Sequence, residues 1–138
     1  MQLKRIAFIL PILIGGLYAG VVLNVTTDVE VDDLTIESGD KMILSTGITL
    51  TVNGDVVITG ELEMADGSVV DAGGNVTITG VLDMDGSSRL KMTGDLTFTA
   101  GTLEADAGTR IDLDGGAAQT VAGTVIGNFK SLTRRGSN

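Results

Sequence analysis

Acidic side chains recur at a fixed spacing in this chain, and carboxylates are the groups that could bind a metal ion. Glu63, Asp83 and Glu104 lie 20 and 21 residues apart, and Asp85 and Asp106 follow the last two by two residues. If these segments stack as strands about 4.8 Å apart, the carboxylates form ranks that Ca²⁺ could bridge. The five residues are a candidate calcium site. Neither an EF-hand loop nor a Gly-Gly-x-Gly-x-Asp repeat is present in the sequence, so a solvated acidic face is the simpler interpretation.

Threonines form a second periodic set with a different chemistry. The sequence contains two Thr-x-Thr units at the same spacing, preceded by a single threonine, and the residues are Thr59, Thr77, Thr79, Thr97 and Thr99. Regular threonine arrays on a flat face resemble the surfaces of ice-binding proteins, which order water. Threonine is also a favoured residue on the exposed face of a strand, and that explanation requires no ligand. Ice binding is therefore a second candidate function.

The composition excludes several classes of active site. The chain has no histidine, cysteine or tryptophan, which rules out a His-based triad, a Cys nucleophile, a thiolate or imidazole zinc site and a disulfide. Glycoside hydrolysis needs two carboxylates in a cleft, and 3% aromatic residues leave no obvious platform for a sugar. We expect a protein that is not an enzyme, with calcium as the one cofactor to test. A net charge of −9 argues against nucleic acid as a partner.

The strongest signal is an internal repeat. The segments GDVVITG at 54–60, GNVTITG at 74–80 and GDLTFTA at 94–100 follow one another at a spacing of 20 residues. Within and between them, apolar and polar residues alternate, which is the period of a half-buried strand and not of a helix. A shared period with residue-by-residue correspondence predicts a stack of similar coils.

Each coil divides into three short arms of alternating residues. We expect an all-β, single-stranded, right-handed parallel β-solenoid of four to five coils, because parallel crossovers are right-handed in nearly all proteins. A one-residue insertion near Gly101 interrupts the spacing in the last regular coil. On the third arm, Lys91 would lie between Asp71 and Asp112 of the adjacent coils and support the register.

The N-terminal residues predict export. Residues 1–19 contain Lys4 and Arg5, then an apolar run from Ile6 to Gly16, then Leu17, Tyr18 and the small residue Ala19, as in a secretory signal peptide. An uncleaved membrane anchor is the alternative. We expect a partial coil or cap at 20–31, regular coils at 32–114, and an irregular last coil with a C-terminal cap at 115–138, where Phe129 and Leu132 would cover the core.

The motifs GDVVITG, GNVTITG and GDLTFTA resemble the β-solenoid repeats of bacterial secreted and surface proteins, including adhesins of the filamentous haemagglutinin and autotransporter type. The resemblance covers Val21 to about Ile126 and concerns repeat style only. It implies a non-enzymatic structural or adhesion module, secreted or on the cell surface, with a cell-envelope or host-surface partner. Uncovered terminal coils would favour end-to-end self-association into filaments. Whether the chain is part of a longer surface protein or a self-contained short solenoid stays open.

Overall fold

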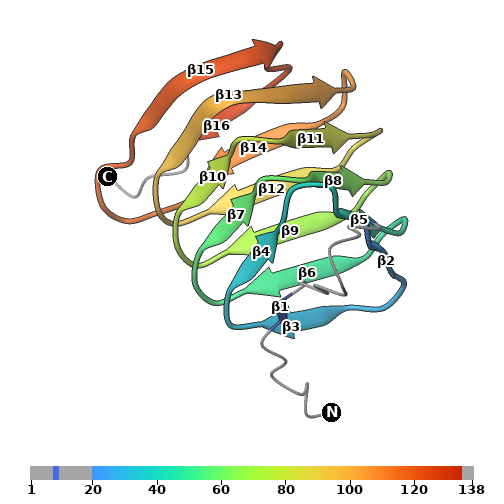
Figure 1. The fold of residues 1–138 in the computed structure, drawn as a ribbon. Helices are drawn as coiled ribbons and strands as arrows, with labels where there is room; N and C mark the ends of the chain where they lie inside the picture. Colours follow the sequence, from blue (N-terminus) through green and yellow to red (C-terminus); the bar gives the residue numbers. More distant parts are fainter. Residues whose placement is uncertain (1–7, 10–19, 135–138) are drawn as a thin grey trace.

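The protein is a β-solenoid, as Figure 1 shows for the computed structural model. The structure describes residues 8–9 and 20–134, and within them every regular element is a β-strand. Parallel strands stack in about six turns of about 20 residues, which confirms the predicted fold class. The described residues include no helix that is long and apolar enough to cross a membrane.

The strands fall into two sheets. A ten-stranded sheet holds the first and second arms, and a six-stranded sheet holds the third arm. The strands are β1 (Phe8–Ile9), β2 (Val22–Val25), β3 (Val29–Val31), β4 (Leu34–Ile36), β5 (Lys41–Leu44), β6 (Thr49–Val52), β7 (Val56–Ile58), β8 (Glu61–Met64), β9 (Val69–Ala72), β10 (Val76–Ile78), β11 (Val81–Met84), β12 (Arg89–Met92), β13 (Leu96–Ala105), β14 (Arg110–Leu113), β15 (Val121–Gly127) and β16 (Leu132–Arg134).

The strand pairing follows the repeat that the sequence predicts. Val76 of β10 lies opposite Leu96 of β13, 20 residues on, whereas Leu82 of β11 lies opposite Leu103, 21 residues on. The extra residue sits at the corner, where Ala100 adopts a left-handed φ of 57° just before Gly101. The insertion predicted near Gly101 is therefore confirmed. It joins the first and second arms of this turn into the single strand β13.

The core is a set of stacked columns that run through the turns. Alternate residues of each interior arm point inward and are fully or almost fully buried, and one column contains Leu34, Val56, Val76 and Leu96. Each side chain packs on its counterparts in the turns before and after it, because the strands pair in register. Burying one aliphatic side chain of this size stabilises the fold by about 1.5–3 kcal/mol.

The expected count of four to five coils was slightly low, because both terminal turns are irregular. β15 and β16 form a last turn on β13 and β14, but Gly123 and Gly127 lie opposite the inward residues Phe98 and Leu103. Because glycine occupies these two inward positions, the alternating apolar pattern is interrupted in the sequence of the last turn. Phe129 compensates by packing edge-on against Phe98, with ring centroids 5.6 Å apart.

At the other end, β2 and β3 pair with β5 and β6 of the following turn. The segment 1–19 predicted as a signal peptide lies outside the described residues, apart from β1, whose backbone pairs with β4. Leu132, expected to cover the core together with Phe129, is 46% exposed in β16.

A ladder of side-chain hydrogen bonds runs along the corner before the first arm. The Oδ1 atoms of Asp33, Asp55, Asn75 and Asp95 accept hydrogen bonds of 2.7–2.9 Å from the backbone N–H of the corresponding residue one turn later, and the last donor is Thr120. A glycine precedes the donor in three of the four links. A Cβ on Gly74 would lie 2.2 Å from Asp55 Oδ1, so a side chain there would displace the acceptor. We call these four residues the corner ladder.

Substitutions at Asp55 test the corner ladder. Asp55→Ala removes an acceptor and should lower the free energy of unfolding by about 1 kcal/mol. Asp55→Asn should cost much less, because Asn75 fills the equivalent position in the next turn with an amide oxygen. Urea unfolding followed by circular dichroism measures both. Equal losses in the two variants would show that the hydrogen bond is not what Asp55 contributes.

Candidate functional site

The candidate site is a group of three carboxylates on the second arm. Glu61 and Glu63 extend outward from β8, and Asp83 extends from β11, where it lies directly opposite Glu63. One oxygen atom from each lies within 4.8 Å of the other two, and all three residues are half-buried. We call Glu61, Glu63 and Asp83 the acidic cluster. Its spacing is short enough for the three oxygens to share one cation.

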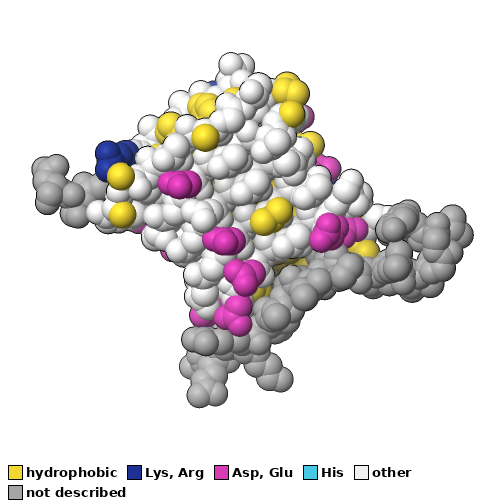
Figure 2. All heavy atoms as spheres, turned by 60° about the vertical axis from the view of Figure 1, so that its left-hand side comes forward, with side chains coloured by type: hydrophobic (Ala, Val, Ile, Leu, Met, Phe, Trp, Pro, Cys, Tyr) yellow, Lys and Arg dark blue, Asp and Glu magenta, His cyan; other side chains and the backbone are white. Residues whose placement is uncertain are grey.

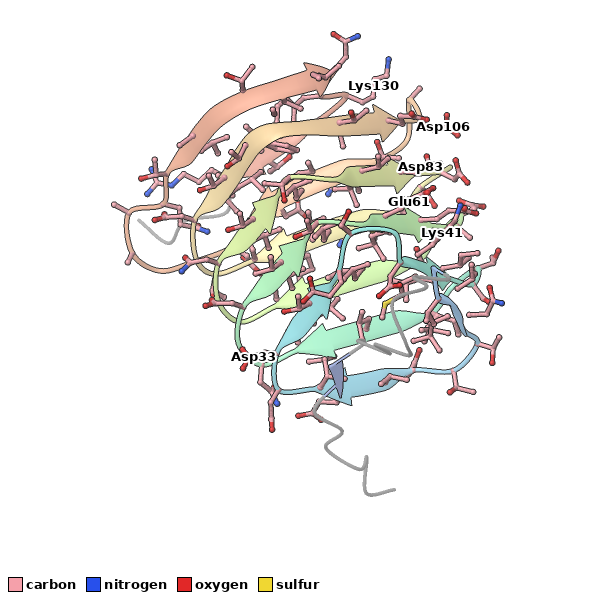
Figure 3. All side chains as sticks on the ribbon, in the orientation of Figure 1. Asp33, Lys41, Glu61, Asp83, Asp106 and Lys130 are labelled. Atoms are coloured by element: carbon pink, nitrogen blue, oxygen red, sulfur yellow. The ribbon has the colours of Figure 1, made fainter. Side chains whose placement is uncertain are left out.

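Lys41 of β5 already supplies a positive charge to this cluster. Its Nζ atom lies 2.9 Å from Oε1 of Glu61 and also contacts Oε2 of Glu63. Hydrogen bonds from Lys41 to Glu63 and then to Glu61 hold the pKa of the lysine well above its usual range. Figure 3 shows Lys41, Glu61 and Asp83 following one another along one edge of the stack. The ammonium group thus lies against two of the three carboxylates that a shared metal ion would contact.

Asp83 is the member of the cluster that Lys41 does not contact. Burial raises the pKa of its carboxyl group, and the negative charges of Asp85, Glu104, Glu63 and Glu61 raise it further. Ionised Asp83 is therefore held in an unfavourable environment at neutral pH.

The five residues of the predicted calcium site do not converge. Glu63, Asp83 and Glu104 are successive neighbours in β8, β11 and β13, but Glu104 is exposed and lies outside the acidic cluster. Asp85 is exposed as well, and Asp106 accepts a hydrogen bond from the backbone N–H of Gly86 at 3.1 Å. Calcium binding by this set remains a prediction.

Sequence reasoning missed Glu61 and Lys41, although a signal was present. The two residues are 20 positions apart and lie opposite each other in β8 and β5. They occupy the first position of the second arm, whereas the residues of the predicted calcium site occupy the third and fifth positions. The ion pair with Glu63 additionally depends on the long lysine side chain reaching along the strand.

The predicted threonine face is short. Thr77 and Thr97 are neighbours in register, but Val57 and Ala122 occupy the same position in the turns on either side. Thr59, Thr79 and Thr99 are exposed at the corner, where the Thr79 hydroxyl donates a weak hydrogen bond of 3.3 Å to the carbonyl of Ile58. Ice binding remains a prediction.

The ion pairs of the third arm differ from the expected arrangement. Lys91 lies between Asp71 and Asp112 in register, but it pairs only with Asp71, at 3.0 Å. The side chain of Asp112 is 2% exposed and instead approaches Nε of Arg89 at 3.4 Å and of Arg110 at 3.9 Å. Two arginines from the adjacent outward column thus balance the buried carboxylate of Asp112. They approach it diagonally across the sheet and not from directly opposite positions.

Comparison of the chain with protein-family models, with curated proteins and with solved structures found no match. Any function is therefore argued from the geometry.

The pKa of Asp83 leads to a pH-dependent prediction. A carboxyl group with a raised pKa in the folded state favours folding while it is protonated, and this contribution is lost as the pH rises through the folded pKa. Asp83→Asn should therefore increase the free energy of unfolding at pH 7 by less than about 1 kcal/mol, which should be seen as a higher melting temperature. The gain should disappear below the ordinary aspartate pKa of about 3.9. Melting curves at several pH values measure it.

Asp114→Asn provides the control, because Asp114 is exposed and does not belong to the acidic cluster. This variant should melt like the wild type across the same pH range. A gain for Asp83→Asn that is equally large at acidic pH would contradict the electrostatic explanation.

Proposed function

We propose that the protein is a non-enzymatic structural module, an exported β-solenoid that serves at or beyond the cell surface. One observation carries this proposal: the residues that make the sequence repetitive form contacts between turns. The Asp or Asn that follows the first glycine of GDVVITG, GNVTITG and GDLTFTA belongs to the corner ladder, and the alternating apolar residues form the core columns. The repeated positions therefore serve the rigidity of a stack.

The acidic cluster supports the same proposal over calcium binding. Lys41 pairs with two of its three carboxylates, so the chain itself supplies a cation that offsets part of the negative charge. Calcium also takes about six to eight oxygen ligands, and the cluster offers three side chains. Lys41 acts here as an internal counter-ion that holds β5 against β8.

Export and surface location rest on residues 1–19, and adhesion to an envelope or host surface rests on the resemblance of the repeats. A rigid rod with a hydrogen-bonded corner suits a spacer or a display surface, because it holds its shape without a ligand. Within this proposal the outward side chains of the arms provide the surface for a partner.

The location can be tested by fractionating cells that produce the full chain. We expect the protein outside the cytoplasm, with Gly20 as its first residue after cleavage behind Ala19. Leu13→Arg is the matched control, because a charge in the apolar run should keep the chain in the cytoplasm. Mass spectrometry identifies the N-terminus. An uncleaved wild-type chain in the cytoplasmic fraction would refute export.

Calcium dependence separates a structural module from an ion-binding one. We expect the wild-type melting temperature to be the same in calcium and in chelator, since Lys41 occupies the acidic cluster. Calcium at a hundred times its dissociation constant would otherwise stabilise the fold by about 2.7 kcal/mol.

Lys41→Ala is the informative variant, because it removes the internal cation and should make melting respond to calcium. Lys91→Ala removes a lysine that pairs with Asp71 elsewhere and should show no such response. A saturable calcium effect on the wild type that Glu63→Gln abolishes would support the ion-binding alternative instead.

A further inference from the structure

In the part of the chain that the structure describes, the solenoid ends in strands that have no paired strand on their outer side. β1, β2 and β3 close the N-terminal end of the two sheets, and β15 and β16 close the C-terminal end. Figure 1 shows the two ends on opposite sides of the stack. Their outward-facing backbone N–H and C=O groups are a template for a further parallel strand.

Exposed apolar side chains are confined to these terminal strands. Within residues 20–134, the large hydrophobic side chains that are exposed are Val22 of β2, Val121 and Ile126 of β15, and Leu132 of β16. No interior strand of the described chain contributes one. Apolar exposure restricted to the two ends is what an interface between the ends would require.

Register places the two most exposed of these residues in the same column. Following the strand pairs from turn to turn, one outward column runs through Val22, Lys41, Glu61, Val81, Thr102 and Ile126. Val22 and Ile126 are its first and last members, and each is 59% exposed. If a second molecule continued the stack, its Val22 would meet Ile126 of the first. On the third arm, Leu132 ends an inward column that Val29 begins, and Val29 is half-buried.

The two ends also carry opposite charge. The N-terminal turn contains Asp28, Glu30, Asp32 and Asp33 and no basic residue between positions 20 and 33. After Asp114 the sequence has no acidic residue, and the described part of the last turn carries Lys130 and Arg134. Figure 2 shows most acidic side chains of the visible face toward its lower, N-terminal end. Figure 3 shows Lys130 at the opposite end from Asp33.

We propose that copies of this chain stack end to end, with β2 and β3 of one molecule pairing in parallel with β15 and β16 of the next. Continued register brings Val22 against Ile126 and Val29 against Leu132. The same register places Thr133 opposite Glu30 and Arg134 opposite Val31 of the neighbouring molecule. The contact joins two different surfaces, so it does not close on itself and produces a linear fibre.

This inference goes beyond the structural role proposed above and does not depend on cellular location. The contact uses the second and third arms, so it does not depend on β1 either. A chain that proved monomeric would leave the structural module intact, and an assembling chain that stayed in the cytoplasm would leave the stacking intact.

The experiment uses the chain in the length that cells produce, followed by sedimentation velocity over a range of concentrations and by electron microscopy. We expect species that lengthen with concentration and shorten in high salt, because the charged part of the contact is screened. Val22→Lys and Ile126→Lys should each be monomeric, since every contact needs one surface of each kind. Thr102→Lys, in the same column but in an interior turn, should assemble like the wild type.

Mixing the two blocked variants gives the sharpest outcome. Val22→Lys retains a functional C-terminal end and Ile126→Lys a functional N-terminal end, so an equal mixture should form dimers and nothing longer. Circular dichroism checks that both variants are folded, and threonine replaces lysine at either position if folding fails. A wild-type chain that is monomeric at all concentrations, or blocked variants that still form fibres, would overturn the proposal.

Discussion

Hydrogen bonds at one corner set how each turn is placed on the turn before it. In a strand whose residues alternate between core and solvent, a shift of one residue would turn Val76 outward and Thr77 inward along with every equivalent pair. The corner ladder opposes such a shift, because Asp55 Oδ1 accepts a hydrogen bond from the N–H of Asn75 and a shift would break it. Core packing rewards the same register. The core columns, the acidic cluster and the third-arm ion pairs all exist because that register is kept.

Most of the fold could be predicted from the sequence because the interior turns repeat residue by residue. Alternation identified the buried positions, and a spacing of 20 identified which of them share a column. The last turn could not be predicted in this way, since Gly123 and Gly127 stand where apolar residues would continue the pattern. Phe129 packs against Phe98 from a position outside the repeat. The spacing of 20 residues cannot predict that a residue outside the repeat fills this place.

The candidate site was predicted less completely, for a reason that lies in side-chain length. Register alone placed Asp83 beside Glu63, and the structure agrees. It could not place the charge of Lys41 beside Glu63 or the guanidinium of Arg89 beside Asp112, because both reach diagonally between columns. The spacing of like charges in the sequence therefore does not show whether the resulting column of carboxylates is paired with basic residues. The long basic side chains of neighbouring columns decide whether that rank is balanced.

The corner ladder also makes one turn an interchangeable unit of length. Asp33, Asp55 and Asn75 each present the same Oδ1 acceptor to the turn that follows, and Asp55 and Asn75 each donate their N–H to the turn before. Loss of residues 54–73 would bring Asn75 onto Asp33 and Val76 onto Leu34, with every core column intact, and a duplication would extend the stack in the same way. Genes for this chain can accordingly gain or lose whole turns while both ends keep their own chemistry. The number of turns can change, whereas the side chains that form each turn are constrained by the turns on either side.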